Sequence, residues 1–144
     1  MQDVAARFEQ ASAGGLTMTS PLSGLRVLIV EDEALVAMMA EDMLSDLGCV
    51  VVDVAGTVSQ GLAIAGDDSR QVDTAVLDVN LGGETVYPVA EALKARGVPF
   101  IFATGYAPSS ISRSFAHVPV LAKPYRLDAL EERLVSAIEP RPAS

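Results

Sequence analysis

The stretch RVLIVEDEALVAMMAEDMLSDLG, residues 26–48, decides the fold. It opens with a short β-branched run at 26–30, which is typical of a strand covered by helices on both faces. Apolar residues at helical spacing follow, and Gly48 ends the helix. The side chains expected to face the core are Leu35, Val36, Met39, Ala40, Met43, Leu44 and Leu47. A buried strand followed by an amphipathic helix is the repeating unit of a parallel sheet.

The same alternation continues along the chain. Further strands are expected at 49–55, 74–78, 99–104 and 118–122, and further helices at 57–66, 87–97, 109–116 and 127–139. The helix at 109–116 is the weakest pattern of the set, and the helix at 57–66 is expected to turn Val58, Leu62 and Ala65 inward. Five strands and five helices predict an α/β fold, a doubly wound (βα)5 domain. Its five-stranded parallel sheet is expected to have the flavodoxin-like order 2-1-3-4-5.

Three segments differ in composition. Residues 1–23 form an N-terminal extension, expected to be mobile or to contain a short amphipathic helix around Val4, Phe8 and Ala11. Residues 24–139 carry the strand and helix pattern and are expected to form one domain. Residues 140–144 are a C-terminal tail.

The composition excludes several classes of protein. The chain has 144 residues and a net charge of −9, which argues against a nucleic-acid partner and favours a cation or a basic protein surface. No apolar run is long enough to span a membrane, and no secretion signal is visible, so a cytoplasmic protein is expected. Cys49 is expected to be a buried apolar residue, and His117, the one histidine, to be a surface loop residue.

Polar residues follow four of the five strands. They are Glu31, Asp32 and Glu33 after the first strand, Asp78 and Asn80 after the third, Thr104, Gly105 and Tyr106 after the fourth, and Lys123 and Pro124 after the fifth. In an open parallel sheet, ligands bind outside the carboxyl ends of the strands, so these residues are expected to share one edge.

The carboxylates at this edge predict a metal site. If the first and third strands are neighbours, then Glu31, Asp32 and Asp78 converge, and their mutual repulsion favours a bound cation. An all-oxygen set suits Mg²⁺ better than Zn²⁺. In the alternative interpretation, the acidic run merely stabilises the N-terminus of the first helix through the helix dipole.

The remaining polar groups indicate phosphoryl transfer. Asp78 would be the nucleophile that forms an acyl phosphate, while Lys123 and Thr104 would hold oxygens of the transferred group. Neither GxxxxGK[ST] nor GxGxxG is present. An aspartyl-phosphate hydrolase of the haloacid-dehalogenase type needs a second aspartate two residues after the nucleophile. Asn80 stands there, which disfavours that alternative.

Four motifs, VLIVEDE (27–33), AVLDVNL (75–81), FATG (102–105) and LAKPY (121–125), give the chain a resemblance to the receiver domains of bacterial response regulators. The resemblance covers about residues 25–139. It implies that Asp78 accepts a phosphoryl group from a histidine kinase, and that Glu31, Asp32 and the Asn80 carbonyl hold Mg²⁺ with Asp78. It also implies that Thr104 and Lys123 contact the phosphoryl group and that the Lys123–Pro124 peptide is cis.

One position departs from the family pattern. Receivers commonly carry an aromatic switch residue three positions before the lysine, and Val120 stands there. FATGY resembles the FATGUY subgroup, which is often paired with kinases of the HWE or related families, although Tyr106 follows Gly105 without the intervening residue. Tyr106 is the first candidate to report phosphorylation to the surface, and the alternative is that it shields the site. Gly105 is expected to let the backbone turn close to a ligand.

The favoured hypothesis is a single-domain response regulator, a phosphoprotein that catalyses only its own phosphorylation and dephosphorylation. It would signal through the face formed by the fourth helix, fifth strand and fifth helix, as a monomer or weak dimer, with no membrane partner. A phosphorylation-independent binding module and an aspartyl-phosphate phosphatase stay open as alternatives.

Overall fold

The computed structural model describes residues 21–139. Residues 1–20 and 140–144 lie outside the described part, and with them lie the predicted C-terminal tail and nearly all of the predicted N-terminal extension. Of that extension, residues 21–23 are described, and they include Leu22. Its side chain is buried in the core, and its carbonyl oxygen accepts a hydrogen bond from the Sγ of Cys49 at 3.5 Å. Cys49 is buried as expected, and burial raises the pKa of its thiol to about 11, which keeps it protonated.

Five parallel strands form the central sheet, in the order β2-β1-β3-β6-β7. Their bounds are Arg26–Val30 for β1, Val50–Ala55 for β2, Thr74–Asp78 for β3, Phe100–Thr104 for β6 and Val120–Ala122 for β7. This is the predicted order 2-1-3-4-5, because β6 and β7 are the fourth and fifth strands of this sheet along the chain. A separate antiparallel hairpin of β4 (Asn80–Leu81) and β5 (Glu84–Thr85) comes directly after β3.

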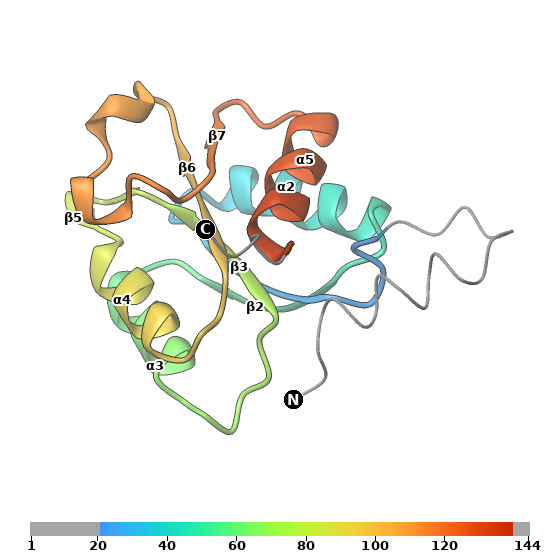
Figure 1. Ribbon diagram of the computed structural model, residues 1–144, viewed down its shortest axis with the longest axis horizontal. Helices are drawn as coiled ribbons and strands as arrows, with labels where there is room; N and C mark the ends of the chain where they lie inside the picture. Colours follow the sequence, from blue (N-terminus) through green and yellow to red (C-terminus); the bar gives the residue numbers. More distant parts are fainter. Residues whose placement is uncertain (1–20, 140–144) are drawn as a thin grey trace, which may run out of the picture.

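Helices cover both faces of the sheet (Figure 1). Helices α2 (Ala34–Asp46) and α5 (Leu127–Ile138) lie on one face, and α3 (Val58–Ala65) and α4 (Tyr87–Ala95) lie on the other. Alternate residues of each strand point to opposite faces, so Ile29 and Ile101 pack beneath α2 and α5, whereas Leu77 and Phe102 pack beneath α3 and α4. The sheet is therefore the middle layer of a doubly wound domain.

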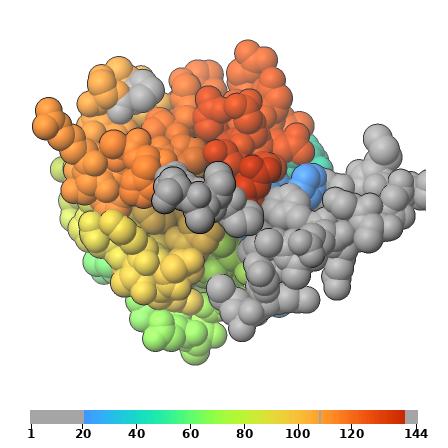
Figure 2. Space-filling model, in the orientation of Figure 1, coloured from blue at the N-terminus to red at the C-terminus, as the bar shows by residue number. Residues whose placement is uncertain are grey.

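The prediction of a fourth helix at 109–116 is wrong, because this segment does not form an α-helix. The segment between β6 and β7, residues 105–119, is called the crossover below. It forms two short 3₁₀ turns, η1 (Pro108–Ser110) and η2 (Arg113–Phe115). Serine side chains compete with a regular helix here, because the Ser110 hydroxyl donates to the Ala107 carbonyl and the Ser112 hydroxyl accepts from the Ser114 N–H. The described residues thus contain four α-helices, and the exposed crossover lies beside α4 and α5 at the surface (Figure 2).

Two helices also face the sheet differently from the prediction. In α2 the predicted core residues Leu35 and Met39 are 76% and 45% exposed. Ala37, which the prediction left out, faces the sheet together with the predicted Ala40. The N-terminal half of α2 has more apolar residues than one face can hold, and the smallest side chains allow the closest approach. In α3 Leu62 is exposed rather than inward. A Cβ at Gly61 would lie 2.9 Å from Val89 Cγ2, so this glycine must face α4.

Candidate functional site

The loop after β1 brings three carboxylates together. Glu31 continues the strand, and its N–H donates to the Ala55 carbonyl oxygen at 2.9 Å, which fixes its position at the edge of the sheet. Its side chain is buried, whereas Asp32 and Glu33 are exposed. Carboxylate oxygens of these three residues lie within 4.8 Å of one another. Glu31 and Asp32 are two of the three acidic residues that the sequence predicts as metal ligands, and Asp78 is the third.

Asp78 ends β3, a strand that is buried along its whole length. One carboxylate oxygen, Oδ2, lies 3.1 Å from Lys123 Nζ, and the other, Oδ1, accepts a hydrogen bond of 3.4 Å from the Asn80 N–H. Asn80 itself is exposed at the start of the β4–β5 hairpin. Because β3 lies between β1 and β6, the aspartate stands in the centre of the carboxyl edge.

Lys123 joins the acidic residues of the two neighbouring strands. It follows β7, and its N–H donates to the Thr104 carbonyl oxygen at 3.0 Å. Its ammonium lies 2.8 Å from Glu31 Oε1 as well as 3.1 Å from Asp78. The peptide bond to Pro124 is cis, as the resemblance implies. The structure therefore places Glu31, Asp78 and Lys123 in direct contact.

The charges of this cluster do not balance. Burial, together with the hydrogen bond and the charge of Glu31, raises the pKa of Asp78 to about 7, although Lys123 opposes the shift. Burial lowers the pKa of Lys123, but Glu31 and Asp78 outweigh this effect, and its pKa is raised overall. Two buried carboxylates thus share one ammonium, with Asp32 exposed beside them. An excess of carboxylate oxygens suits a hard divalent cation, so the residues present fit Mg²⁺.

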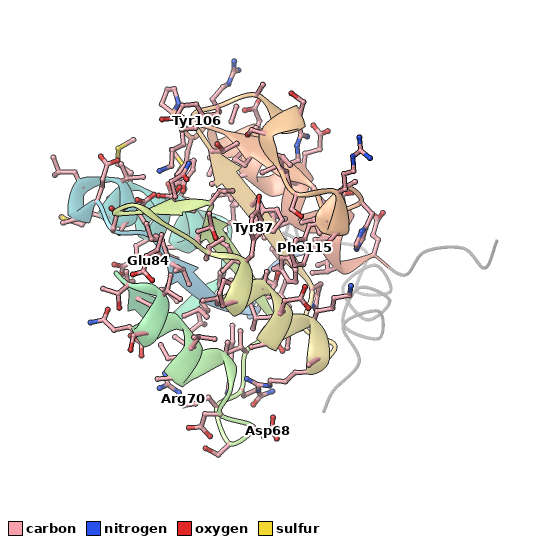
Figure 3. The ribbon with its side chains drawn as sticks, turned by 90° about the vertical axis from the view of Figure 1, so that its left-hand side faces the viewer. Asp68, Arg70, Glu84, Tyr87, Tyr106 and Phe115 are labelled. Carbon is pink, nitrogen blue, oxygen red and sulfur yellow. The ribbon has the colours of Figure 1, made fainter. Side chains whose placement is uncertain are left out.

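Thr104 and its two successors form a turn at the same edge. Thr104 ends β6, is 3% exposed, and its hydroxyl accepts a hydrogen bond of 3.0 Å from the Tyr106 N–H. The Tyr106 side chain is 69% exposed, and it stands away from the labelled rings of the core (Figure 3). A Cβ at Gly105 would meet no atom within 4 Å, so the described residues do not themselves require a glycine there.

The sequence analysis missed Tyr125. This side chain is buried, and its hydroxyl donates to Glu31 Oε1 at 3.4 Å, next to the Lys123 ammonium. Burial and the neighbouring carboxylates raise the pKa of the phenol, which therefore stays protonated and remains a donor. An aromatic residue two positions after the lysine, in an otherwise polar turn, was the signal for an inward-facing side chain.

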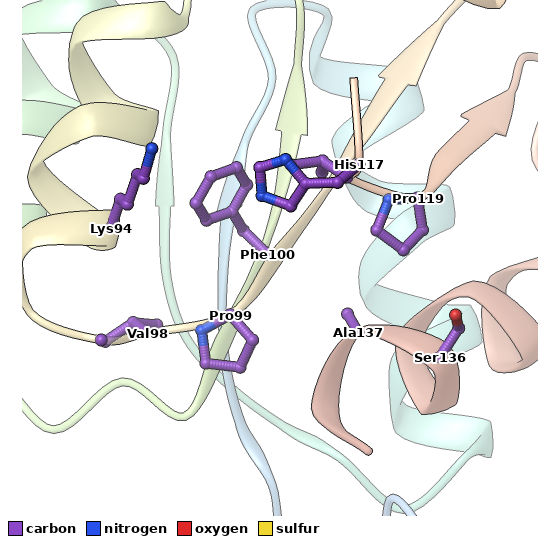
Figure 4. Close-up of a pocket in the computed structure, with 10 residues that line it drawn as sticks. Lys94, Val98, Pro99, Phe100, His117, Pro119, Ser136 and Ala137 are labelled. Carbon is purple, nitrogen blue, oxygen red and sulfur yellow. The ribbon is translucent and has the colours of Figure 1, made fainter. Parts of the chain in front are cut away.

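A pocket of about 360 Å³ lies elsewhere in the molecule (Figure 4). Pro99 and Pro119, which precede β6 and β7, form part of its wall, together with Lys94 of α4 and Ala137 of α5. It therefore lies at the amino ends of the strands, whereas Asp78 lies at their carboxyl ends. His117, which lines it, is an exposed loop residue as predicted.

The fold and the edge cluster together define a class of protein, a doubly wound α/β domain with an acidic pocket and a lysine at the carboxyl ends of its strands. The chain matches the model of the response regulator receiver domain over residues 27–135, and it belongs to that family. Receiver domains are signalling modules of two-component systems rather than catalytic enzymes in general. The fold of solved receiver structures agrees with the one described above.

Two solved structures of SdrG are similar to this chain. SdrG from Sphingomonas melonis Fr1 is 46% identical, with a TM-score of 0.70, over 80% of this chain and 96% of its own. The BeF₃-activated conformation of SdrG from Pseudomonas melonis Fr1 is also 46% identical, with a TM-score of 0.69, over 81% of this chain and 99% of its own.

A longer relative is similar over part of the chain. The phyllosphere-induced regulator PhyR of Methylorubrum extorquens is 37% identical over 82 residues, which make up 56% of this chain and 30% of that relative. The chain therefore aligns with less than a third of PhyR. Among residues 21–139, no helix is long and apolar enough to cross a membrane.

Proposed function

We propose that this protein is a phosphoacceptor response regulator, in which Asp78 takes a phosphoryl group from the phosphohistidine of a histidine kinase. The observation that carries the proposal is the contact of Lys123 with both Glu31 and Asp78 at the carboxyl edge of the sheet. This arrangement supports the proposal, because a nucleophile, a cation and the donors of a metal site would then surround one point, as phosphoryl transfer requires.

The roles of the residues follow from their positions. Asp78 attacks the phosphorus through a carboxylate oxygen, the P–N bond of the donor breaks, and the histidine leaves with the bonding electron pair. Lys123 and the Thr104 hydroxyl take oxygens of the transferred group. Glu31, Asp32, Asp78 and the Asn80 carbonyl would hold Mg²⁺, which supplies positive charge against the incoming phosphoryl oxygens. Hydrolysis of the acyl phosphate at the same site would return the protein to its starting state.

The predicted surface for binding a downstream protein differs from the fold in one element. The predicted face included a fourth helix, and the structure has the crossover in its place. We therefore propose that a downstream protein binds the crossover, β7 and α5, with Tyr106 at the margin of that face. The net charge of −9 favours a basic partner surface. A kinase of the HWE or related families is the proposed phosphodonor.

Incubation with Mg²⁺ and acetyl phosphate, followed by intact-mass measurement, tests the proposal. The expected result is one added phosphoryl group on the wild type, no addition without Mg²⁺, and none on Asp78→Asn. An unlabelled wild type that still binds its partner would favour a phosphorylation-independent binding module. Continuous release of phosphate from many phosphomonoesters would favour the phosphatase, against which Asn80 already argues.

A further inference from the structure

Tyr87 lies where the loop that follows Asp78 meets the loop that follows Thr104. It is the first residue of α4 and comes two residues after β5, so it closes the hairpin that begins with Asn80. That hairpin is held to the end of β3 by a hydrogen bond of 2.9 Å from the Val86 N–H to the Val79 carbonyl oxygen. The position of Tyr87 is therefore tied to the loop that carries a proposed metal ligand.

The other side of Tyr87 holds the crossover. Its hydroxyl oxygen accepts a hydrogen bond of 2.9 Å from the Ser112 N–H, 25 residues further along the chain. Its ring stacks on Phe115, with centroids 5.4 Å apart and an interplanar angle of 14°, and meets Phe102 edge-on at 5.8 Å (Figure 3). Phe115 is 2% exposed, so Tyr87 contacts the one crossover side chain that is inserted furthest into the core.

The internal hydrogen bonds of the crossover are short in range. They join Ser110 to Ala107, Phe115 to Ser112 and Ala116 to Arg113, so they stabilise each turn without fixing it to the domain. The bond from Tyr87 provides a fixed point outside the crossover. Val120, at the position where receivers commonly carry an aromatic switch, is only partly buried against the same cluster. The aromatic contact beneath this surface comes from Tyr87 and Phe115 instead.

We propose that Tyr87 is the positioning residue that couples the phosphorylation site to the crossover. The inference rests on the proposed function. A phosphoryl group on Asp78 would recruit the Thr104 hydroxyl, which now accepts the Tyr106 N–H, and would displace the turn from which the crossover starts. Mg²⁺ at the Asn80 carbonyl would act on the hairpin that ends at Tyr87. The first change moves the crossover, which carries Ser112, and the second moves the hairpin that ends at Tyr87, so both act on the hydrogen bond between these two residues. This bond is sensitive to either movement because a hydrogen bond tolerates only a narrow range of distances.

Hydrogen–deuterium exchange of the full chain tests this coupling, measured with Mg²⁺ and with or without excess acetyl phosphate. Tyr87→Phe keeps the ring and removes the acceptor oxygen. Ser112→Ala is the matched control, because it keeps the N–H that donates to Tyr87 and removes only the side-chain hydroxyl. Ser112→Pro removes the same hydrogen bond from its other end, at a residue whose φ of −54° suits proline. Intact mass records the labelling of each variant in parallel.

In the wild type and in Ser112→Ala, phosphorylation is expected to change the exchange of peptides from the crossover. In Tyr87→Phe and Ser112→Pro the labelling of Asp78 is expected to persist, while the phosphorylation-dependent change falls about threefold or more. A merely structural role would raise exchange equally with and without the phosphodonor, which would contradict the coupling. A full change in labelled Tyr87→Phe, or no change in the labelled wild type, would also overturn it. Failure to label the wild type would refute the proposed function itself.

Discussion

At the scale of single residues, an imbalance of charge explains the site. Asp78 and Glu31 are buried carboxylates that share the Lys123 ammonium. Removal of a carboxylate from water is costly unless the charge is compensated, and one ammonium cannot fully compensate two carboxylates. The raised pKa of Asp78 is the consequence, and a bound divalent cation would reduce the repulsion between the two carboxylates.

The affinity for Mg²⁺ is expected to depend on pH. In the metal-free protein the pKa of Asp78 is about 7, so below that pH the metal must displace a proton from the carboxyl group. The apparent dissociation constant should therefore rise about tenfold for each unit of pH below about 7, and level off above it. Titrations followed by amide NMR between pH 6 and 8 measure this. A constant affinity across that range would contradict the assignment of Asp78 as a ligand.

Lys123→Ala is expected to separate phosphorylation from its consequence. Asp78 remains available as nucleophile, so labelling by acetyl phosphate should continue at a reduced rate. The cation that would respond to the new phosphoryl charge is lost, so the change in hydrogen exchange of the crossover should fall several-fold. Arg126→Ala, at an exposed residue of the adjacent loop, is the control. A Lys123→Ala protein with the complete conformational change would be inconsistent with this role.

At the scale of the elements, the crossover depends on one aromatic anchor. Its two 3₁₀ turns are too short to bury an apolar face as a regular helix would, and Phe115 supplies the contact with Tyr87, Phe100 and Phe102. The serines that disrupt the helix also form the local hydrogen bonds that replace it. Phe115 is therefore the largest contact of the crossover with the core, beside the smaller Val118 and the partly buried Ile111.

Phe115→Ala is expected to lower the free energy of unfolding by about 3 kcal/mol or more, because it removes a buried ring and leaves a cavity. Leu35→Ala is the matched control, since Leu35 is 76% exposed and its truncation should change stability by about 0.5 kcal/mol or less. Urea denaturation followed by circular dichroism measures both. Equal effects of the two changes would show that Phe115 does not anchor the crossover.

The sequence predicts the strands better than the helices, for a physical reason. A strand such as Thr74–Asp78 is apolar throughout because both of its faces are covered, and such a run has few alternatives. Leu35, Met39 and Leu62 satisfy helical periodicity, but periodicity does not say which of several apolar stripes meets the sheet. The close approach of Gly61 to Val89 decides this for α3, and it depends on the tertiary structure. The serine-rich crossover likewise has helical spacing without helical hydrogen bonding.

The candidate site was predictable in outline, because strand order alone brings Glu31, Asp78 and Lys123 to one edge. The contacts of Tyr125 with Glu31 and of Tyr87 with Ser112 were not predictable. Each joins residues far apart in sequence, so no local pattern indicates the partner of either phenol. The roles of Thr104, Gly105 and Tyr106 remain predictions that depend on a bound phosphoryl group.

At the scale of the whole molecule, the two edges of the sheet differ in chemistry. The carboxyl edge carries the acidic cluster and Lys123, whereas the amino edge carries the pocket with its proline walls. Each connection returns the chain to the same end of the sheet before the next parallel strand begins, so the carboxyl ends of all five strands lie at one edge. The topology and the charge cluster are the reasons why we propose that phosphoryl transfer takes place at Asp78.

Chemical mapping of the phosphorylated residue tests this claim most directly. After treatment of the full chain with Mg²⁺ and acetyl phosphate, borohydride reduces an aspartyl phosphate to homoserine, which peptide mass spectrometry locates. The expected result is homoserine at position 78, absent when Mg²⁺ or the phosphodonor is omitted. Homoserine at another acidic position, such as Asp32, or none in the treated protein, would contradict the account.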